Sequence, residues 1–192
     1  MEIKKENIVK AYSKADDNVK EVLLELFPEL QLKTAQTASK RPITERIKTF
    51  EDACEELGNQ NILVQGYEDA TCSDFLTIDM LAYLKLRIVC AALNEGWEPQ
   101  FTEDETRWYP WHWLYTQEEI DEMDEDEKTD LHMMTTGDYL TEYAGFACAL
   151  SAAAPSASRT SFGSRLCLKS DTLAIYCGKQ FIELWADFKL IR

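Results

Sequence analysis

Apolar residues recur with helical spacing in four stretches of the chain, and helix start or stop signals lie at their ends. Asp16 or Asp17 can cap the first helix, and Pro28 ends it. Thr49 and Asp52 form a variant capping box before the second. Each stretch predicts an amphipathic helix that buries one side. The four apolar stripes are Val19, Val22, Leu23, Leu26 and Phe27; Phe50, Ala53, Cys54 and Leu57; Met80, Leu81, Leu84, Ile88, Ala91 and Ala92; and Leu173, Cys177, Phe181, Leu184 and Phe188.

Three segments have the alternating or aromatic composition that is typical of β-strands. They span residues 107–115, 143–151 and 162–168. Between the first two, Thr116 and Glu119 form a capping box that opens a short acidic helix. We expect the three strands to pair as one antiparallel sheet.

Together these elements predict an α+β fold, in which a small antiparallel sheet is covered on one face by two long helices. The covering helices are expected at 77–95 and 171–190. Residues 31–42 are rich in Thr, Ser and Gln, which indicates a linker. The predicted organisation is a helical arm at 1–30, a linker at 31–42 and an α+β domain at 43–192.

The charge of the chain is strongly negative and unevenly distributed. The net charge is −15, and residues 98–142 hold 15 acidic but only two basic side chains. A protein that binds duplex nucleic acid needs a footprint of lysine and arginine, so this balance argues against a duplex as the partner. Residues 143–192 hold six basic and three acidic side chains. That segment can still provide a local site for a small anion.

Sequence features also bear on the compartment. No apolar segment follows Met1, so no secretory signal is expected. The longest low-charge run, 143–155, is shorter than the roughly 20 residues that a membrane span needs. The six cysteines form no close pair of the zinc or thioredoxin type, although their even number allows disulfides. We expect a reduced, cytoplasmic protein without a membrane partner.

Three of the five tryptophans lie within residues 108–115. Strand alternation places Trp111 and Trp113 on one face with Tyr109 and Tyr115, and Trp108 and His112 on the other with Leu114. Both faces cannot be exposed to solvent at tolerable cost. We expect one face to pack in the core and the other to be able to bind a base, a sugar or a partner protein.

A second candidate site is the basic segment that contains Arg159, Ser161, Ser164, Arg165 and Lys169. Arginine offers two parallel donors, and a loop with glycine offers backbone N–H groups, so the mixture suits phosphate or carboxylate recognition. Its spacing matches neither a Walker A loop nor a dinucleotide fingerprint. The alternative is a polar hairpin loop whose arginine balances the acidic segment.

Signals for catalysis, a cofactor or a metal ion are weak. The chain has only two histidines, His112 and His132, and no nucleophile motif accompanies them. A histidine among tryptophans is more often packed and hydrogen-bonded than a general base. The acidic run 118–130 lacks the glycine and the ligand spacing of a calcium loop, which favours a solvated helix face or a docking surface. We predict no cofactor, no metal and no enzymatic activity.

Several segments resemble a family of uncharacterised proteins from gut Bacteroidetes and their phages. The resemblance covers most of residues 44–190 and implies a phage or mobile-element setting, hence the cytoplasm of an infected cell or a virion. It implies no activity and assigns no role to any residue. The segments that carry it are Glu45–Gly58, Asp79–Trp97 with Pro99, and Gly163–Lys169 with Tyr176, Gly178, Lys179, Gln180 and Phe181.

Three functional hypotheses follow. The leading one is a non-enzymatic phage-type binding or assembly protein that self-associates or docks through its N-terminal amphipathic helix and its aromatic segment. The alternative is a module that sequesters a small anionic ligand, such as a nucleotide signal in counter-defence, between tryptophan rings and Arg159, Arg165 and Lys169. A hydrolase of unknown type is a weaker third hypothesis.

Overall fold

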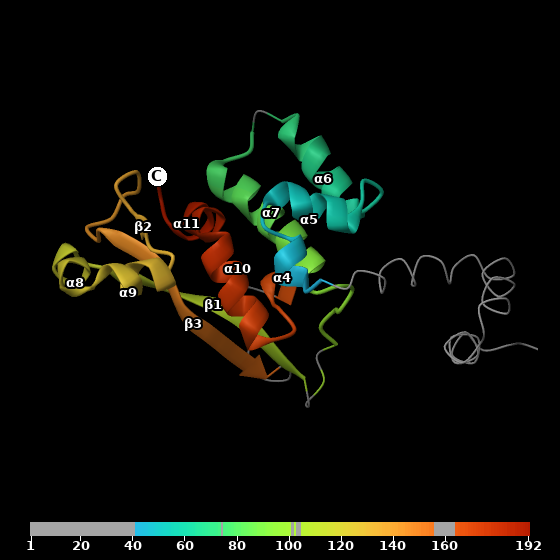
Figure 1. The fold of residues 1–192 in the computed structure, drawn as a ribbon. Helices are drawn as coiled ribbons and strands as arrows, with labels where there is room; N and C mark the ends of the chain where they lie inside the picture. Colours follow the sequence, from blue (N-terminus) through green and yellow to red (C-terminus); the bar gives the residue numbers. More distant parts are fainter. Residues whose placement is uncertain (1–40, 74, 101, 103–104, 156–163) are drawn as a thin grey trace, which may run out of the picture. The chain divides into compact units, whose positions relative to one another are not determined.

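The computed structural model describes residues 41–192, except residues 74, 101, 103–104 and 156–163. Ile43–Arg192 forms one compact unit. The predicted helical arm and all but the last two residues of the predicted linker lie outside the described residues, so they stay predictions. Within the compact unit, helices and a small antiparallel sheet give the α+β fold that the sequence predicts (Figure 1).

Four helices precede the sheet in the sequence. They are α4 (Ile43–Arg46), α5 (Phe50–Leu57), α6 (Ile62–Thr71) and α7 (Ile78–Leu93). The predictions for α5 and α7 are confirmed, including the Thr49–Asp52 capping box. Helix α6 was not predicted from the sequence. Its only buried residue among those described is Val64, and Gly66 weakens helical propensity at its centre, so its periodic signal is poor.

The three-stranded sheet has the order β1-β3-β2. Its strands are β1 (Thr106–Tyr115), β2 (Met134–Thr135) and β3 (Gly145–Pro155). The first and second predicted strands correspond to β1 and β3 and are confirmed. They pair antiparallel from Tyr115 opposite Gly145 to Thr106 opposite Pro155, with one register shift between Trp111 and His112.

The third predicted strand, at 162–168, is wrong in the residues that the structure describes. Ser164–Leu166 forms a 3-10 helix, η1, and only Leu168 pairs with the sheet, through an isolated bridge to Trp108. Leu166, Cys167 and Leu168 are all buried. In a half-buried strand, successive side chains alternate between the core and the solvent, so three consecutive buried residues do not fit that pattern. The third strand of the sheet is instead the short β2.

The predicted helix at 171–190 is two helices, α10 (Asp171–Gln180) and α11 (Ile182–Lys189). They meet at Phe181, whose backbone leaves the helical region at φ −114° and ψ 36°. Helix α10 contacts β1 and β3, whereas α11 contacts β3 and α7 (Figure 1). The break lets Cys177 of α10 and Trp185 of α11 both enter the same core.

Two short acidic helices follow β1. They are α8 (Gln117–Glu122), which begins at the predicted Thr116–Glu119 capping box, and α9 (Glu125–Asp130), which begins at a second box formed by Asp124 and Glu127. The backbone N–H groups at each start are therefore bonded by side chains. Much of the acidic run is a solvated pair of helices.

The described residues include no helix that combines the length and apolar character needed to cross a membrane. All six cysteines are free thiols in this structure. Four of them are buried and Cys54 is partly so, as expected where reduced cysteine packs as a small hydrophobic residue; Cys72 is exposed.

Candidate functional site

One face of the β1–β3 ribbon carries exposed aromatic rings. Trp111 and Trp113 are 46% and 50% exposed, and their rings meet edge to face with centroids 6.3 Å apart. Leu150 of β3 pairs with Trp111 in the register and is 45% exposed. We call Trp111, Trp113 and Leu150 the outer aromatic face. The prediction that one face of the tryptophan segment is exposed is confirmed.

The opposite face of β1 packs inward. Trp108 is partly buried against the main core. The ring of His112 stacks on Phe146 with centroids 4.8 Å apart and an interplanar angle of 2°. Trp108 and His112 are therefore packing residues here, and the expectation that one face of the ribbon enters the core is confirmed. Helix α10 covers this side, since a side chain at Gly178 would meet Pro110 and Cys148.

Tyr109 departs from simple alternation. It should share the exposure of Trp111, yet it is only 2% exposed because Trp97 and Cys167 pack around it. Burial raises the pKa of its hydroxyl above the ordinary value. Packing from the loop after α7 thus divides one strand face into an exposed part and a covered part.

His112 and Lys189 form a polar contact inside the inner face. The Nζ atom of Lys189 lies 2.9 Å from Nδ1 of His112 and 5.1 Å from the ring centroid of Trp185. Burial, and then the charge of Lys189, lower the pKa of His112 to about 3. Burial lowers the pKa of Lys189 to about 8. At neutral pH the imidazole is therefore neutral and accepts a hydrogen bond from the ammonium group.

We expect the imidazole of His112 to stay neutral in the folded chain while pH falls well below 6.5. Its pKa is about 3 when folded and 6.5 in its ordinary state, so the unfolded chain binds more protons in this interval. Stability contributed by His112 is complete above about pH 6.5 and is lost as pH falls toward 3. NMR of the imidazole resonances during a pH titration measures the protonation of His112 directly.

The other histidine provides the control for that titration. His132 is exposed, and a His132→Gln variant removes its signals, so the remaining imidazole resonances belong to His112. The interpretation of a packed, neutral His112 is contradicted if these resonances titrate near pH 6.5 while the chain is folded.

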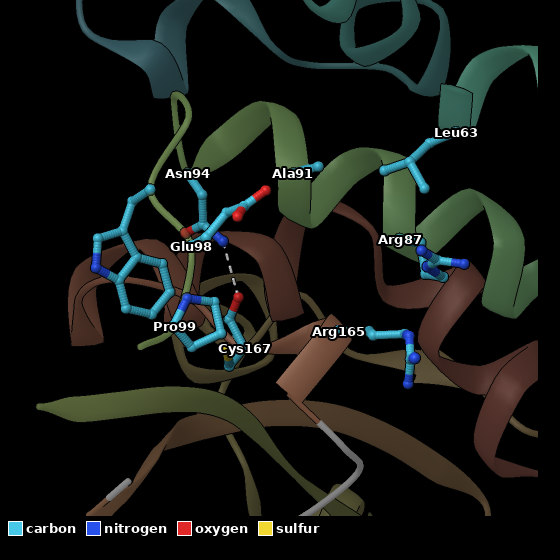
Figure 2. Close-up of a pocket in the computed structure, with 9 residues that line it drawn as sticks. Leu63, Arg87, Ala91, Asn94, Glu98, Pro99, Arg165 and Cys167 are labelled. Carbon is cyan, nitrogen blue, oxygen red and sulfur yellow. Dashed lines mark hydrogen bonds between the residues drawn. The ribbon is translucent and has the colours of Figure 1, made fainter. Parts of the chain in front are cut away.

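A pocket of about 470 Å³ lies beside α7 (Figure 2). Arg87 and Ala91 of α7 line it together with Asn94, which caps this helix. Figure 2 shows Arg87 and Arg165 on one side of the pocket, and Asn94 and Glu98 on the other. The remaining lining residues are Leu63, Trp97, Pro99 and Cys167.

The side chain of Asn94 holds together two segments that line this pocket. Its side chain is 6% exposed and donates from Nδ2 to the Cys167 carbonyl at 2.9 Å, which is the bond drawn in Figure 2. Its Oδ1 accepts from the Lys169 N–H at 3.0 Å. The amide therefore ties the end of α7 to the segment that follows Arg165, and it acts as a scaffold.

The basic residues predicted to bind an anion do not all reach the pocket. Arg165 is exposed and lines it. Lys169 instead donates from Nζ to a carboxylate oxygen of Glu95 at 2.8 Å, and the other oxygen of Glu95 accepts from Arg46 at 2.8 Å. Ser164 belongs to η1. The other two residues of the predicted basic site, Arg159 and Ser161, lie outside the described residues.

Arg87, Trp97 and Asn94 were not among the site residues predicted from the sequence. One signal was present, because Arg87, Ala91 and Asn94 follow the i, i+4, i+7 spacing that places residues on one helix face. The loop residues Trp97 and Glu98 join that face only through tertiary packing. A helix pattern alone does not indicate that Arg165 lies opposite.

Neither a metal site nor a similar protein of known function helps to assign a role to this chain. In the described part of the chain, no three His, Cys, Asp or Glu side chains come together as a metal site. Compared with known proteins, the chain matches no family model, no curated protein and no solved structure. The resemblance to the Bacteroidetes and phage family stays a prediction.

Proposed function

We propose that this chain is a non-enzymatic binding and assembly protein whose copies associate through the outer aromatic face. The observation that carries the proposal is the exposure of Trp111, Trp113 and Leu150 side by side on one sheet face. Large aromatic rings at the surface are enriched where proteins bind one another. The phage setting and the cytoplasmic or virion location that the resemblance implies belong to this proposal.

The occupant that we propose for this face is the apolar stripe of the N-terminal segment in a second copy. The sequence places Val22, Leu23 and Leu26 on one side of a predicted helix at 16–27. Such a stripe needs an apolar partner, and the outer aromatic face offers one. An amphipathic helix that lays its apolar side on such a surface is a common recognition mode.

Salt should strengthen this association. The chain carries a net charge of −15, so two copies repel each other, and dissolved ions screen that repulsion. The opposite salt dependence would indicate attraction between charged groups. The sign of the salt effect therefore separates apolar docking from electrostatic association.

Sedimentation velocity of the full chain over a wide concentration range tests the proposal. We expect the mean mass to rise above 22.1 kDa with concentration, and the Trp111→Ser/Trp113→Ser variant to weaken association at least tenfold, or about 1.4 kcal/mol. Leu23→Asp/Leu26→Asp should weaken it similarly because it charges the stripe.

The matched control is Ile62→Ser/Phe75→Ser. Ile62 and Phe75 are 81% and 91% exposed, so this variant removes two large apolar side chains of α6 and the loop after it. It should associate like the unmodified chain. A strict monomer at every concentration would overturn the proposal, and so would equal loss in the control and in the tryptophan variant.

A further inference from the structure

The pocket beside α7 has the size and lining of a small-ligand site that is separate from the outer aromatic face. Its volume of about 470 Å³ lies within the roughly 300–1,000 Å³ of ligand pockets. None of Trp111, Trp113 and Leu150 lines it. A ligand here is therefore a different function from the proposed self-association.

Two arginines give one side of the pocket a positive character. Arg87 comes from α7 and Arg165 from η1 (Figure 2). Within the described part of the chain, neither guanidinium makes an ion pair or a hydrogen bond. A guanidinium presents parallel N–H donors that match a phosphate or a carboxylate. These two are available to an anion.

The described carboxylates near this pocket do not pair with the two arginines. Glu95, the nearest carboxylate in sequence to Asn94, is already bound by Arg46 at 2.8 Å and by Lys169 at 2.8 Å. Among the described residues that line the pocket, Glu98 is the only one with a carboxylate, and it lies on the side opposite the arginines in Figure 2. The pocket is thus positive at one end and has one hydrogen-bond acceptor at the other.

The pocket also has an apolar part that includes an aromatic ring. Trp97 lines the pocket and packs against Tyr109 and Cys167, which holds the indole in place. Pro99, Leu63 and Ala91 supply the remaining apolar surface. An indole held in this way is a good stacking partner for the planar ring of a base.

We infer that this pocket binds a nucleoside monophosphate. The phosphate would take the donors of Arg87 and Arg165, the base would stack on Trp97, and an amino or hydroxyl group would donate to Glu98. The ligand class follows from the arginine pair, the aromatic ring and the carboxylate acceptor that line one pocket. Asn94 has a structural role here, because its amide joins the Cys167 carbonyl to the Lys169 N–H.

Isothermal titration of the full chain with AMP, GMP, CMP and UMP tests the inference, with inorganic phosphate and the neutral nucleosides as separate arms. We expect at least one monophosphate to bind, and its nucleoside and phosphate alone to bind at least tenfold more weakly. Arg165→Ala should weaken binding at least tenfold, or about 1.4 kcal/mol. Trp97→Ala should reduce the preference for the nucleotide over free phosphate.

Three further variants make the result specific. Arg165→Lys keeps the charge but removes the paired donors, so its affinity should fall between the parent and Arg165→Ala. Lys128→Ala removes a positive charge on the acidic helix α9 and should leave affinity unchanged. Trp111→Ser/Trp113→Ser should bind nucleotide normally, which separates failure of this site from failure of the proposed self-association.

Two results would overturn the inference. The first is the absence of binding by every monophosphate in the panel. The second is binding that Arg165→Ala and Arg87→Ala both leave unchanged, with circular dichroism showing that the variants are folded. Arg165 is exposed, so its replacement keeps the test valid even if Arg87→Ala does not fold.

Discussion

Asn94→Ala should lower the free energy of unfolding by about 2–5 kcal/mol, because it removes one hydrogen bond to the buried Cys167 and one to the part-buried Lys169 N–H. The Cys167 carbonyl loses its donor at 2.9 Å and the Lys169 N–H loses its acceptor at 3.0 Å. Cys167 is buried, so water does not readily replace the lost bond. The same change releases the segment after Arg165 from the end of α7.

Urea unfolding of Asn94→Ala beside Asn61→Ala measures this effect. Asn61 accepts one bond, from the Leu63 N–H at 2.9 Å, at the start of α6. Removing such a cap costs about 1 kcal/mol. The scaffold role of Asn94 fails if the two variants are equally stable. Asn94→Asp should be intermediate, since it keeps the acceptor for Lys169 and loses the donor to Cys167.

Gly178→Ala should destabilise the fold by about 1–3 kcal/mol through overpacking. An added Cβ would lie 2.7 Å from the Pro110 Cβ and 3.1 Å from the Cys148 Cβ, and it would also clash with the Cys148 Sγ. The helix and the strands cannot move apart easily here, because α10 packs against both β1 and β3. This loss outweighs the roughly 1 kcal/mol that alanine gains over glycine inside a helix.

Gly66→Ala is the matched control for this effect. Gly66 also lies inside a helix, and nothing lies within 4 Å of a Cβ added there. Alanine should therefore stabilise the chain by up to about 1 kcal/mol. If α10 depends on close approach to the sheet, the unfolding temperature should fall for Gly178→Ala and rise for Gly66→Ala. Stabilisation by both would show that the contact between α10 and the sheet is loose.

Local signals predicted the elements whose ends are marked in the sequence. The Thr49–Asp52 and Thr116–Glu119 boxes, and the apolar period of α7, each depend on residues within a few positions of one another. The strands β1 and β3 followed from their aromatic and small residues. The prediction of a third strand was wrong because Leu166 and Leu168 are buried by several elements of the core. Their spacing of two residues resembles the alternating pattern of a strand.

Tertiary packing determines two features that the sequence pattern did not predict: which face of β1 is buried, and which residues share the pocket. Alternation separated Trp108 and His112 from Trp111 and Trp113, but α10 determines which pair is buried, because Gly178 lets that helix settle on one side of β1. The pocket joins residues of α6, α7, the following loop and η1. No local spacing predicts that Arg87 and Arg165 share it.

The contact proposed for the outer aromatic face is tested most directly by fluorine NMR of the chain labelled with 5-fluorotryptophan. The five tryptophans give separate resonances that single Trp→Phe variants assign. As concentration rises, we predict that the signals of Trp111 and Trp113 shift or broaden while that of buried Trp185 stays unchanged. Resonances of Trp111 and Trp113 that stay constant while the mean mass rises would contradict the proposal.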